Sequence, residues 1–310
     1  MDCDIAILIP CFNEEQAIAK VINDFISIYN GYDFKIFIYD NNSTDNTFNI
    51  ANSIDSEHVI CRKEPRQGKG FVVRSMFQHI EANCYILADG DDTYPADKTL
   101  EMVRLVKEEA YDMVIGDRLS TDYHRVNTRK FHSFGNKLVS FLINLFFHSN
   151  ITDIMTGLRV FSRKFVKTSG LLARGFEIET EITILALDGN YKIKEIPISY
   201  KNRMEGSYSK LNTFTDGLKV IKTIFILFKD YRAFEFFTLF FIIFAIIGLA
   251  LFIPVFIEYL KTGLVPRFPT LFISIFFGIL AILSECMGIL LSTITKLYKR
   301  HKEISQMNFK

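Results

Sequence analysis

Tyr85-Ile86-Leu87-Ala88-Asp89-Gly90-Asp91-Asp92 is the stretch of this sequence that decides the fold, because an apolar run ends abruptly in an acidic turn. The β-forming residues predict a buried strand, and the glycine predicts a tight turn where that strand ends. Asp89 and Asp91, two residues apart, could hold a hard divalent cation against a diphosphate. Acidic turns also commonly cap the next helix, so the motif alone leaves both interpretations open.

Short β-rich runs alternate with helical stretches from Asp4 to about Ser199, which is typical of an α/β domain with a mainly parallel sheet. Strands are expected at residues 5–9, 35–39, 58–61, 85–88, 113–115 and 192–198. Helices are expected between them, for example at residues 14–29 and 98–109. Ligands of such sheets bind at the carboxyl ends of the strands, so polar residues directly after a strand form the candidate site.

Two further polar clusters follow predicted strands. They are Pro10-Cys11-Phe12-Asn13-Glu14-Glu15 and Asp40-Asn41-Asn42-Ser43-Thr44-Asp45. A glycine turn, Gln67-Gly68-Lys69-Gly70, precedes a helical stretch and could cradle a phosphate through backbone N–H groups and Lys69. An ordinary turn is the alternative, and the lack of Walker spacing and of G-x-G-x-x-G argues against kinase-like or dehydrogenase-like chemistry.

Overall charge argues against one class of partner. The chain carries 36 Lys and Arg against 35 Asp and Glu, and a net charge of +1 gives no reason to expect nucleic acid as a partner. The five cysteines are scattered, with no C-x-x-C pair that would suggest zinc or a redox dithiol. No basic leader precedes the short apolar run at residues 5–10, so we expect the amino-terminal part to stay in a reducing cytosol.

Two long apolar runs lie near the carboxyl end, at residues 236–257 and 268–294. Each exceeds the roughly 20 residues that span a bilayer, which predicts two transmembrane helices, with buried core helices as the alternative. Basic residues flank the outer ends of the pair: Lys219, Lys222, Lys229 and Arg232 before it, and Lys296, Lys299, Arg300, Lys302 and Lys310 after it. The loop between the runs holds only Lys261 and Arg267, so the positive-inside rule places both termini in the cytoplasm.

These patterns divide the chain into four parts. Residues 1–212 form a cytoplasmic α/β domain, 213–232 a juxtamembrane amphipathic helix, 233–296 a transmembrane hairpin and 297–310 a cytoplasmic basic tail. Residues 214–229 combine apolar residues at helical spacing with lysines, which predicts a helix at the membrane surface. Residues 138–147 are similar, and packing against the sheet is the alternative for both segments. Glu285, inside the second run, is expected to reach water or a neighbouring subunit and is left out of the site.

In this order the motifs resemble glycosyltransferase family 2 with its GT-A fold, a Rossmann-like mainly parallel sheet. The resemblance is carried by Ile9 to Glu15, Asp40 to Asp45, Gly68-Lys69-Gly70 and Asp89 to Pro95. Four later segments resemble the polyisoprenyl-phosphate glycosyltransferase branch, which includes dolichyl-phosphate mannose synthase: Gly116-Asp117-Arg118, Asp153 to Arg163, Gly175 to Glu181 and Arg203 to Leu211. The motifs cover residues 5 to about 215, and the two-helix tail is similar to that of bactoprenol glucosyltransferases.

The resemblance implies a donor site for a nucleotide sugar. Pro10 and Glu14 would lie against the base and ribose, and Asp40 would hold the base or ribose. Asp89 and Asp91 would hold Mg²⁺ or Mn²⁺ at the diphosphate. The stretch with Arg203, Ser209 and Lys210 would close over the diphosphate as a mobile loop. Family members often carry Gln where this chain has Thr93, which leaves the third metal ligand open.

The implied acceptor is a polyprenyl phosphate of the undecaprenyl or dolichyl type. A phosphate monoester has a second pKa of about 6, so it is already an anionic nucleophile at neutral pH and needs alignment more than a general base. Arg118 and Arg129 could align it, although either could instead pair with Asp117, Asp122 or Asp153. Glu177 and Glu179 could contact sugar hydroxyls, or simply stabilise the start of a helix through its dipole.

The predicted function is therefore inverting sugar transfer from a nucleotide sugar, with UDP-linked glucose or N-acetylglucosamine favoured and galactose and mannose open, to a polyprenyl phosphate at a membrane. A homo-oligomer, a lipid-sugar flippase and a downstream transferase are candidate partners. Two rivals are considered. Processive polysaccharide synthases carry a Gln-x-x-Arg-Trp motif, and this chain has no Trp. A catalytically silent membrane scaffold is disfavoured by the intact acidic pair.

Overall fold

The computed structural model describes residues 3–121, 130–201 and 213–307. Its contacts divide the chain into two compact units, Met1–Ile224 and Phe225–Lys310, and each unit is described by itself. The boundary between them falls inside one helix, α9 (Thr213–Tyr231).

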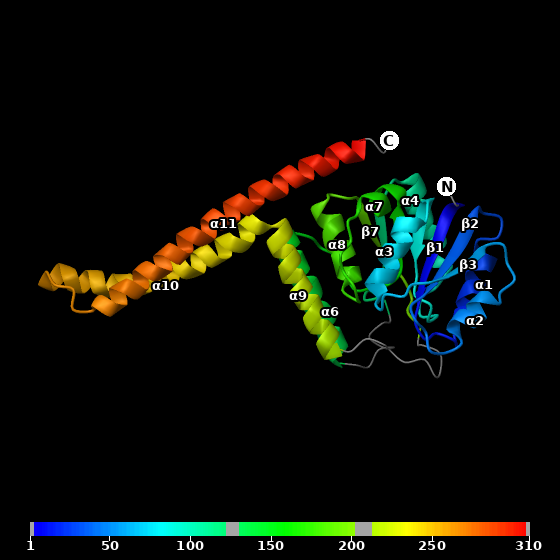
Figure 1. Cartoon of the computed structure of the whole chain (residues 1–310), viewed down its shortest axis with the longest axis horizontal. Coiled ribbons are helices and arrows are strands. Elements are labelled where there is room, and N and C mark those ends of the chain that lie inside the picture. Colours follow the sequence, from blue (N-terminus) through cyan, green and yellow to red (C-terminus); the bar gives the residue numbers. More distant parts are fainter. Residues whose placement is uncertain (1–2, 122–129, 202–212, 308–310) are drawn as a thin grey trace. The chain divides into compact units, whose positions relative to one another are not determined.

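The first unit is built on a seven-stranded mixed sheet in the order β3-β2-β1-β4-β6-β5-β7. Figure 1 labels β1, β2, β3 and β7 of this sheet. Its strands are β1 (Cys3–Cys11), β2 (Phe34–Asp40), β3 (Val59–Lys63), β4 (Ala82–Leu87), β5 (Met113–Asp117), β6 (Arg159–Ser162) and β7 (Ile193–Pro197). All six strands expected from the sequence are confirmed. The seventh, β6, was not expected: it has four residues and runs antiparallel to both of its neighbours, β4 and β5. The remaining pairings are parallel.

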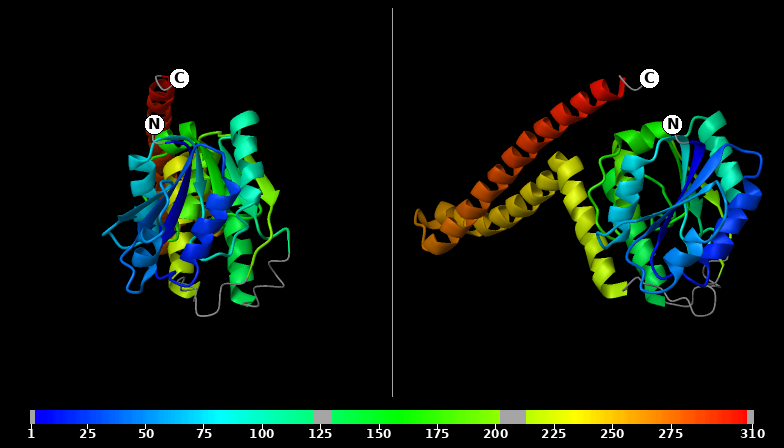
Figure 2. Two further views of the ribbon diagram at one scale, coloured as in Figure 1. Left: turned by 90° about the vertical axis from the view of Figure 1, so that its right-hand side faces the viewer. Right: turned by 45° about the vertical axis from the view of Figure 1, so that its right-hand side comes forward.

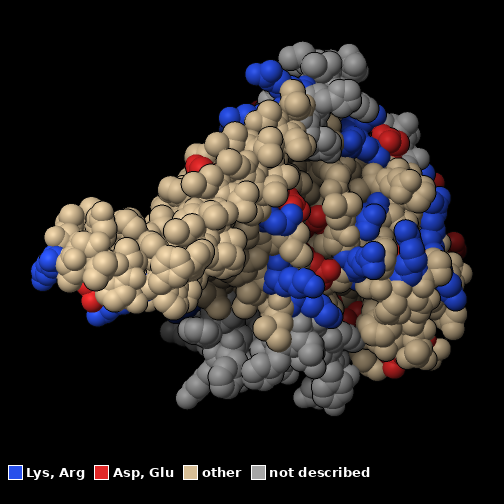
Figure 3. Space-filling view, turned by 60° about the vertical axis from the view of Figure 1, so that its left-hand side comes forward, with Lys and Arg blue, Asp and Glu red and all other residues tan. Residues whose placement is uncertain are grey.

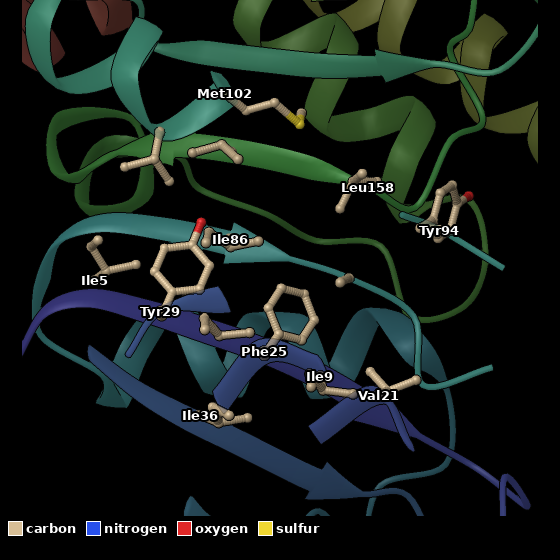
Figure 4. Packing of buried hydrophobic residues seen from close by; sticks show 14 of the residues in the cluster. Ile5, Ile9, Val21, Phe25, Tyr29, Ile36, Ile86, Tyr94, Met102 and Leu158 are labelled. Atoms are coloured by element: carbon tan, nitrogen blue, oxygen red, sulfur yellow. The ribbon is translucent and has the colours of Figure 1, made fainter. Parts of the chain in front are cut away.

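Helices cover both faces of this twisted sheet (Figure 2). The described helices of the unit are α1 (Ile18–Ile28), α2 (Thr47–Asn52), α3 (Lys69–His79), α4 (Lys98–Glu108), α6 (Lys130–Phe147), α7 (Arg163–Thr168) and α8 (Ile178–Asp188). Helices α1 and α4 supply part of one large apolar cluster, in which Phe25 and Met102 pack against Ile86 and Leu158 of the sheet side (Figure 4). Burial of such side chains contributes about 1.5–3 kcal/mol each.

One helix begins later than expected. The sequence predicted a helix from Glu14, but α1 begins at Ile18 because Asn13 has a positive φ of 55° and the Glu14 carbonyl accepts hydrogen bonds from Ala17 and Ile18 in a turn. The four residues before α1 are therefore part of the loop after β1. This keeps their backbone available to the neighbouring loop after β2.

Helix α6 shows two apolar faces. Val139, Ile143 and Phe147 are buried, whereas Phe141 and Leu145 are 61% and 54% exposed. Packing against the domain, the alternative interpretation of residues 138–147, holds for one face of α6. The other face presents large apolar side chains outward, and its place at a membrane surface stays a prediction.

The second unit contains α10 (Ala233–Thr262) and α11 (Phe268–Met307), which pack on each other as a hairpin. Ala233–Thr262 and Phe268–Leu297 are long and apolar enough to cross a membrane, with mean hydropathies of 3.0 and 2.2, and few of their most apolar residues are buried. In the face that Figure 3 shows, the hairpin surface is almost free of charge over its middle part, with charged side chains at its far tip. Glu285, in α11, accepts a hydrogen bond from Thr238 of α10 at 3.1 Å and is partly buried.

Candidate active site

The polar clusters predicted after β1, β2 and β4 lie at one edge of the sheet. These three strands are parallel neighbours, with Cys11 opposite Asp40 and Leu8 opposite Leu87. Parallel neighbours end at the same edge, which brings together the residues that follow them. The candidate site is therefore the carboxyl edge of β2, β1 and β4.

The loops after β1 and β2 are locked together by hydrogen bonds. The Asn13 N–H donates to Ser43 Oγ at 2.9 Å, and the Thr44 N–H donates to Asn13 Oδ1 at 2.8 Å. The Glu14 N–H donates to Thr47 Oγ1 at 2.7 Å. Glu14 itself is buried. These bonds fix Glu14 beside the end of β2 and join the loops after β1 and β2 into one surface.

The two carboxylate oxygens of Asp40 differ in their hydrogen bonding. Its side chain is 2% exposed, and Oδ2 accepts from the Ser43 N–H at 3.2 Å. Within the described residues Oδ1 is buried and has no hydrogen-bond partner. A buried carboxylate oxygen without a donor is costly, so this atom is suited to receive an N–H or O–H from a ligand.

The glycine turn is held against β2 by Asn41, a residue that the sequence interpretation did not single out. Asn41 Oδ1 accepts from the Gly68 N–H at 2.7 Å, while its Nδ2 donates to the carbonyls of Glu64 and Arg66. Gly68 has a φ of 132°, and a Cβ there would lie 2.2 Å from the Arg174 carbonyl oxygen. Only glycine fits such an approach.

Lys69 leaves this turn and bridges two carboxylates. Its Nζ lies 2.6 Å from Asp89 Oδ1 and 2.6 Å from Glu179 Oε1. Burial lowers the pKa of Lys69, but the attraction of the two carboxylates outweighs burial and leaves its pKa above the ordinary value. Lys69, at the start of α3, thus stays positively charged and connects two other expected site residues, Asp89 of the acidic turn and Glu179 of α8.

Asp91 is oriented by Thr93. Asp91 is 3% exposed, and its Oδ1 accepts from the Thr93 N–H at 3.2 Å and from Thr93 Oγ1 at 2.6 Å. The residue that stands where relatives often carry Gln therefore positions the second acidic residue. In the described part of the chain no three His, Cys, Asp or Glu side chains converge as a metal cage. A pair of hard carboxylates still fits Mg²⁺ or Mn²⁺, since such ions are often held by one or two carboxylates plus substrate phosphates.

Arg118 is engaged in a buried network. Its Nε and Nη2 donate to Asp153 at 2.7 and 2.9 Å, and its Nη1 donates to the Tyr94 hydroxyl at 3.2 Å. Pairing with Asp153 is the alternative that the sequence left open for Arg118. Its paired donors are thus directed at a carboxylate, and contact with an acceptor phosphate stays a prediction.

Gly157 connects this network to the acidic turn. Its N–H donates to the Tyr94 hydroxyl at 2.8 Å, and a Cβ at this position would lie 2.3 Å from Asp89 Oδ2. The backbone of the segment before β6 therefore packs directly on Asp89. Tyr94, Asp153 and Gly157 belong to recognised motifs, but their joint role needed the three-dimensional structure.

The other expected site residues divide into two groups. Pro10 lies in β1 opposite Tyr39, at the same edge, and Glu177 accepts hydrogen bonds from the Arg174 and Gly175 N–H groups, both at 3.0 Å. Glu177 thus stabilises its own loop. Arg129, Arg203, Ser209 and Lys210 lie outside the described residues.

A Rossmann-like mixed sheet with an acidic turn at its carboxyl edge defines a domain of the GT-A type. Residues 6–170 match the model of Glycosyl transferase family 2. The chain is 32% identical over 214 residues to glycosyltransferase AglJ of Haloferax volcanii, covering 69% of this chain and 68% of that protein. It is 27% identical to a dolichyl-phosphate hexose transferase of the same organism, covering 71% of this chain and 92% of that protein.

Solved structures support the fold. The glucosyl-3-phosphoglycerate synthase of Mycobacterium tuberculosis, in complex with Mn²⁺, UDP-glucose and glycerol 3-phosphate, aligns with a TM-score of 0.55 at 19% identity, covering 73% of this chain and 80% of that chain. The chain belongs to glycosyltransferase family 2, and its resemblance to the polyprenyl-phosphate branch is confirmed by its relatives.

Gly157→Ala tests the close packing on Asp89. The added methyl group has no space beside Asp89 Oδ2, so the acidic turn must shift, and we expect glycosyl transfer to fall roughly tenfold or more, on the scale of an overpacked buried site. Activity is measured beside thermal unfolding. Gly170→Ala is the matched control, because a Cβ there meets nothing within 4 Å. Equal activity of the two variants would contradict the packing argument.

Proposed function

We propose that this protein transfers a sugar from a nucleoside diphosphate sugar to the phosphate of a polyprenyl lipid, with inversion, at a membrane surface. The family and the similarity to a dolichyl-phosphate hexose transferase support the reaction class. Two long, little-buried apolar helices support a lipid acceptor, because they would keep the catalytic domain at the surface where such lipids lie.

The observation that carries the donor assignment is the unpaired Oδ1 of Asp40. This oxygen is buried at the edge where β1 and β2 end, and no described group donates to it. The imide N–H of uracil is a suitable donor, and a charge-assisted hydrogen bond of this kind is about twice as strong as a neutral one. Guanine also presents ring N–H groups, so UDP-linked and GDP-linked sugars are the two donors to compare. Pro10 and Glu14 would border the same base and ribose.

Asp89 and Asp91 would hold a divalent cation, which when bound supplies charge neutralisation at the departing diphosphate. Lys69, buried between Asp89 and Glu179, adds a fixed positive charge at the same place. Glu179 and Glu177 are assigned to sugar hydroxyls, and the stretch with Arg203, Ser209 and Lys210 to closure over the diphosphate. In this assignment the donor is held from two sides, by the nucleotide end and by the diphosphate end.

The acceptor phosphate is the nucleophile. Because it is anionic at neutral pH, attack on the anomeric carbon breaks the bond to the diphosphate without a protein base. Arg118 and Arg129 are assigned to aligning it. Contact between Arg118 and the phosphate requires N–H groups other than those that bond Asp153. We therefore propose that the main role of the Arg118–Asp153 pair is to hold the Tyr94 hydroxyl, which in turn holds the Gly157 N–H.

We further propose that the catalytic domain and both termini are cytoplasmic, as the basic flanks of the apolar runs predict. A second copy of the chain, a flippase for the lipid-linked sugar and a transferase that consumes it would be the partners of such a product.

Asp40→Asn tests the base contact. Asparagine presents an oxygen at only one of the two carboxylate positions and an NH2 group at the other, so it cannot accept from the Ser43 N–H at one position and from a base N–H at the other. We therefore expect UDP to bind roughly 10-fold more weakly, the scale of a lost hydrogen bond to a charged group. Calorimetry with UDP and GDP measures this and identifies the preferred nucleotide. Asp55→Asn, an exposed aspartate in the same half of the domain, is the control. Unchanged UDP affinity of Asp40→Asn would remove Asp40 from the donor site.

Transfer itself is tested with purified protein, a panel of nucleotide sugars and undecaprenyl phosphate, followed by mass spectrometry of the lipid. We expect a lipid-linked monosaccharide whose formation stops with chelator and resumes with Mg²⁺ or Mn²⁺. Asp91→Asn should lower turnover roughly 100-fold, as for loss of one preorganised charge stabiliser. Asp92→Asn, whose carboxylate pairs with Lys20, should stay within a few-fold. A product formed by Asp91→Asn at full rate in metal-free buffer would exclude the metal assignment.

Topology is tested by labelling cysteines in intact cells in a Cys286→Ser background. Leu264→Cys, in the loop between the two apolar helices, should react with a membrane-impermeant maleimide. Lys296→Cys, near the far end of the second apolar stretch, should react only after permeabilisation. The reverse pattern would place the catalytic domain on the outside.

A further inference from the structure

Arg159 is a fully buried arginine at the edge of the site. It lies in β6 opposite Leu87, two residues before Asp89, and its exposed fraction is 0%. Its Nε and Nη2 donate to the carbonyls of Thr156 and Ile154, at 3.2 and 2.5 Å. Burial lowers the pKa of Arg159 to about 10, so the group is still a cation at neutral pH.

No ion pair accompanies this charge among the described residues, where Arg159 bonds only to two carbonyls, Thr183 Oγ1 and the sulfur of Met113. A buried charge without a direct counter-charge costs several kcal/mol. The charges of Glu179 and Asp153 act on it from a greater distance and favour its protonated form. Burying the Arg159 cation therefore costs free energy, and its contacts with residues next to Glu179 and Asp89 suggest a role in holding them.

Thr183 links Arg159 to Glu179. Arg159 Nη1 donates to Thr183 Oγ1 at 2.8 Å, and the same hydroxyl donates to the Glu179 carbonyl at 3.0 Å. Thr183 and Glu179 lie one turn apart on α8, so this link fixes the first turn of the helix that carries Glu179. The hydroxyl uses one lone pair and its proton, and an isosteric valine would lose both bonds.

The link continues into a closed circuit around the donor site. Glu179 contacts Lys69, and Lys69 contacts Asp89. Asp89 packs against Gly157, whose neighbour Thr156 gives its carbonyl to Arg159. Within this circuit, Arg159 and Thr183 act on the backbone that carries Glu179 and Gly157, whereas Lys69 contacts the carboxylates of Asp89 and Glu179 directly.

We propose that Arg159 is a positioning residue that acts through Thr183 and the backbone of residues 156–157 to set the placement of Glu179 relative to Asp89. The proposal rests on the proposed function. Asp40 and Asn41 lie outside the circuit, whereas Lys69 and Asp89 belong to it. Loss of the circuit should therefore lower the rate of transfer and change the choice among sugars by more than it lowers nucleotide affinity.

The test compares two buried threonines of one helix. Thr183→Val keeps the shape and removes both bonds, and we expect kcat to fall roughly 10-fold, with the affinity for UDP changed by less than about 3-fold. Thr183→Ser, which keeps the hydroxyl, should recover most of the rate. Thr180→Val is the control: Thr180 is 0% exposed and its hydroxyl has no partner in the described structure, so its kcat should equal that of the wild type. The ratio of the kcat/KM value for UDP-glucose to that for UDP-galactose should move closer to 1 in Thr183→Val and stay at the wild-type value in the other two variants.

The outcomes separate the two claims. Wild-type kcat in Thr183→Val overturns the positioning role, as does a loss of UDP affinity as large as the loss of rate, which would indicate general damage to the fold. Absence of transfer by the wild-type protein with every donor refutes the proposed function instead. In that case amide hydrogen exchange still tests the circuit: amides of residues 178–183 should exchange faster in Thr183→Val than in Thr180→Val, and equal exchange overturns the circuit.

Discussion

The ion pairs of Lys69 with Asp89 and Glu179 are the interaction on which the site depends. They join a glycine turn, the end of β4 and the first turn of α8, which are separated by 20 and 110 residues in the sequence. Two carboxylates brought to one place repel each other, by about 4 kcal/mol at ~4 Å for an effective dielectric constant near 20. A buried ammonium between them removes that repulsion, and the close backbone approaches at Gly68 and Gly157 allow the three groups to meet.

The sequence predicted much of the fold because the first half of the chain is regular. Strands β1, β2 and β4 end in polar clusters, and the rule that parallel strands end at one edge correctly brought Asp40, Asp89 and the loop of Glu14 together. Strand β6 was not predicted from the sequence because it is short, antiparallel and contains Arg159, a residue type that argues against a buried strand. Asn41 was also not predicted, because its role depends on hydrogen bonds to residues 64–68 that only the folded chain brings near.

Arg118 shows where residue type alone stops being informative. A guanidinium suits a phosphate and a carboxylate equally well, since both accept paired hydrogen bonds. Asp153, 35 residues away in sequence, is fully buried and receives that pair. The sequence offered Asp153 as a partner but contained no signal to rank it above a lipid phosphate. The structure assigns the described donors of Arg118 to Asp153 and Tyr94.

The charge balance at the carboxyl edge gives a physical reason for a divalent cation. Among the described residues Asp89, Asp91 and Glu179 bring three negative charges to this edge, and Lys69 brings one positive charge. A nucleoside diphosphate sugar adds about two negative charges, and an attacking phosphate monoester adds between one and two more at neutral pH. Arg159 adds a positive charge in β6, but its side chain is fully buried and bonded to Thr183 and the Ile154 carbonyl. In the proposed reaction, departure of the diphosphate would therefore be favoured by further positive charge at the acidic turn, and two hard carboxylates are ligands that suit Mg²⁺ or Mn²⁺.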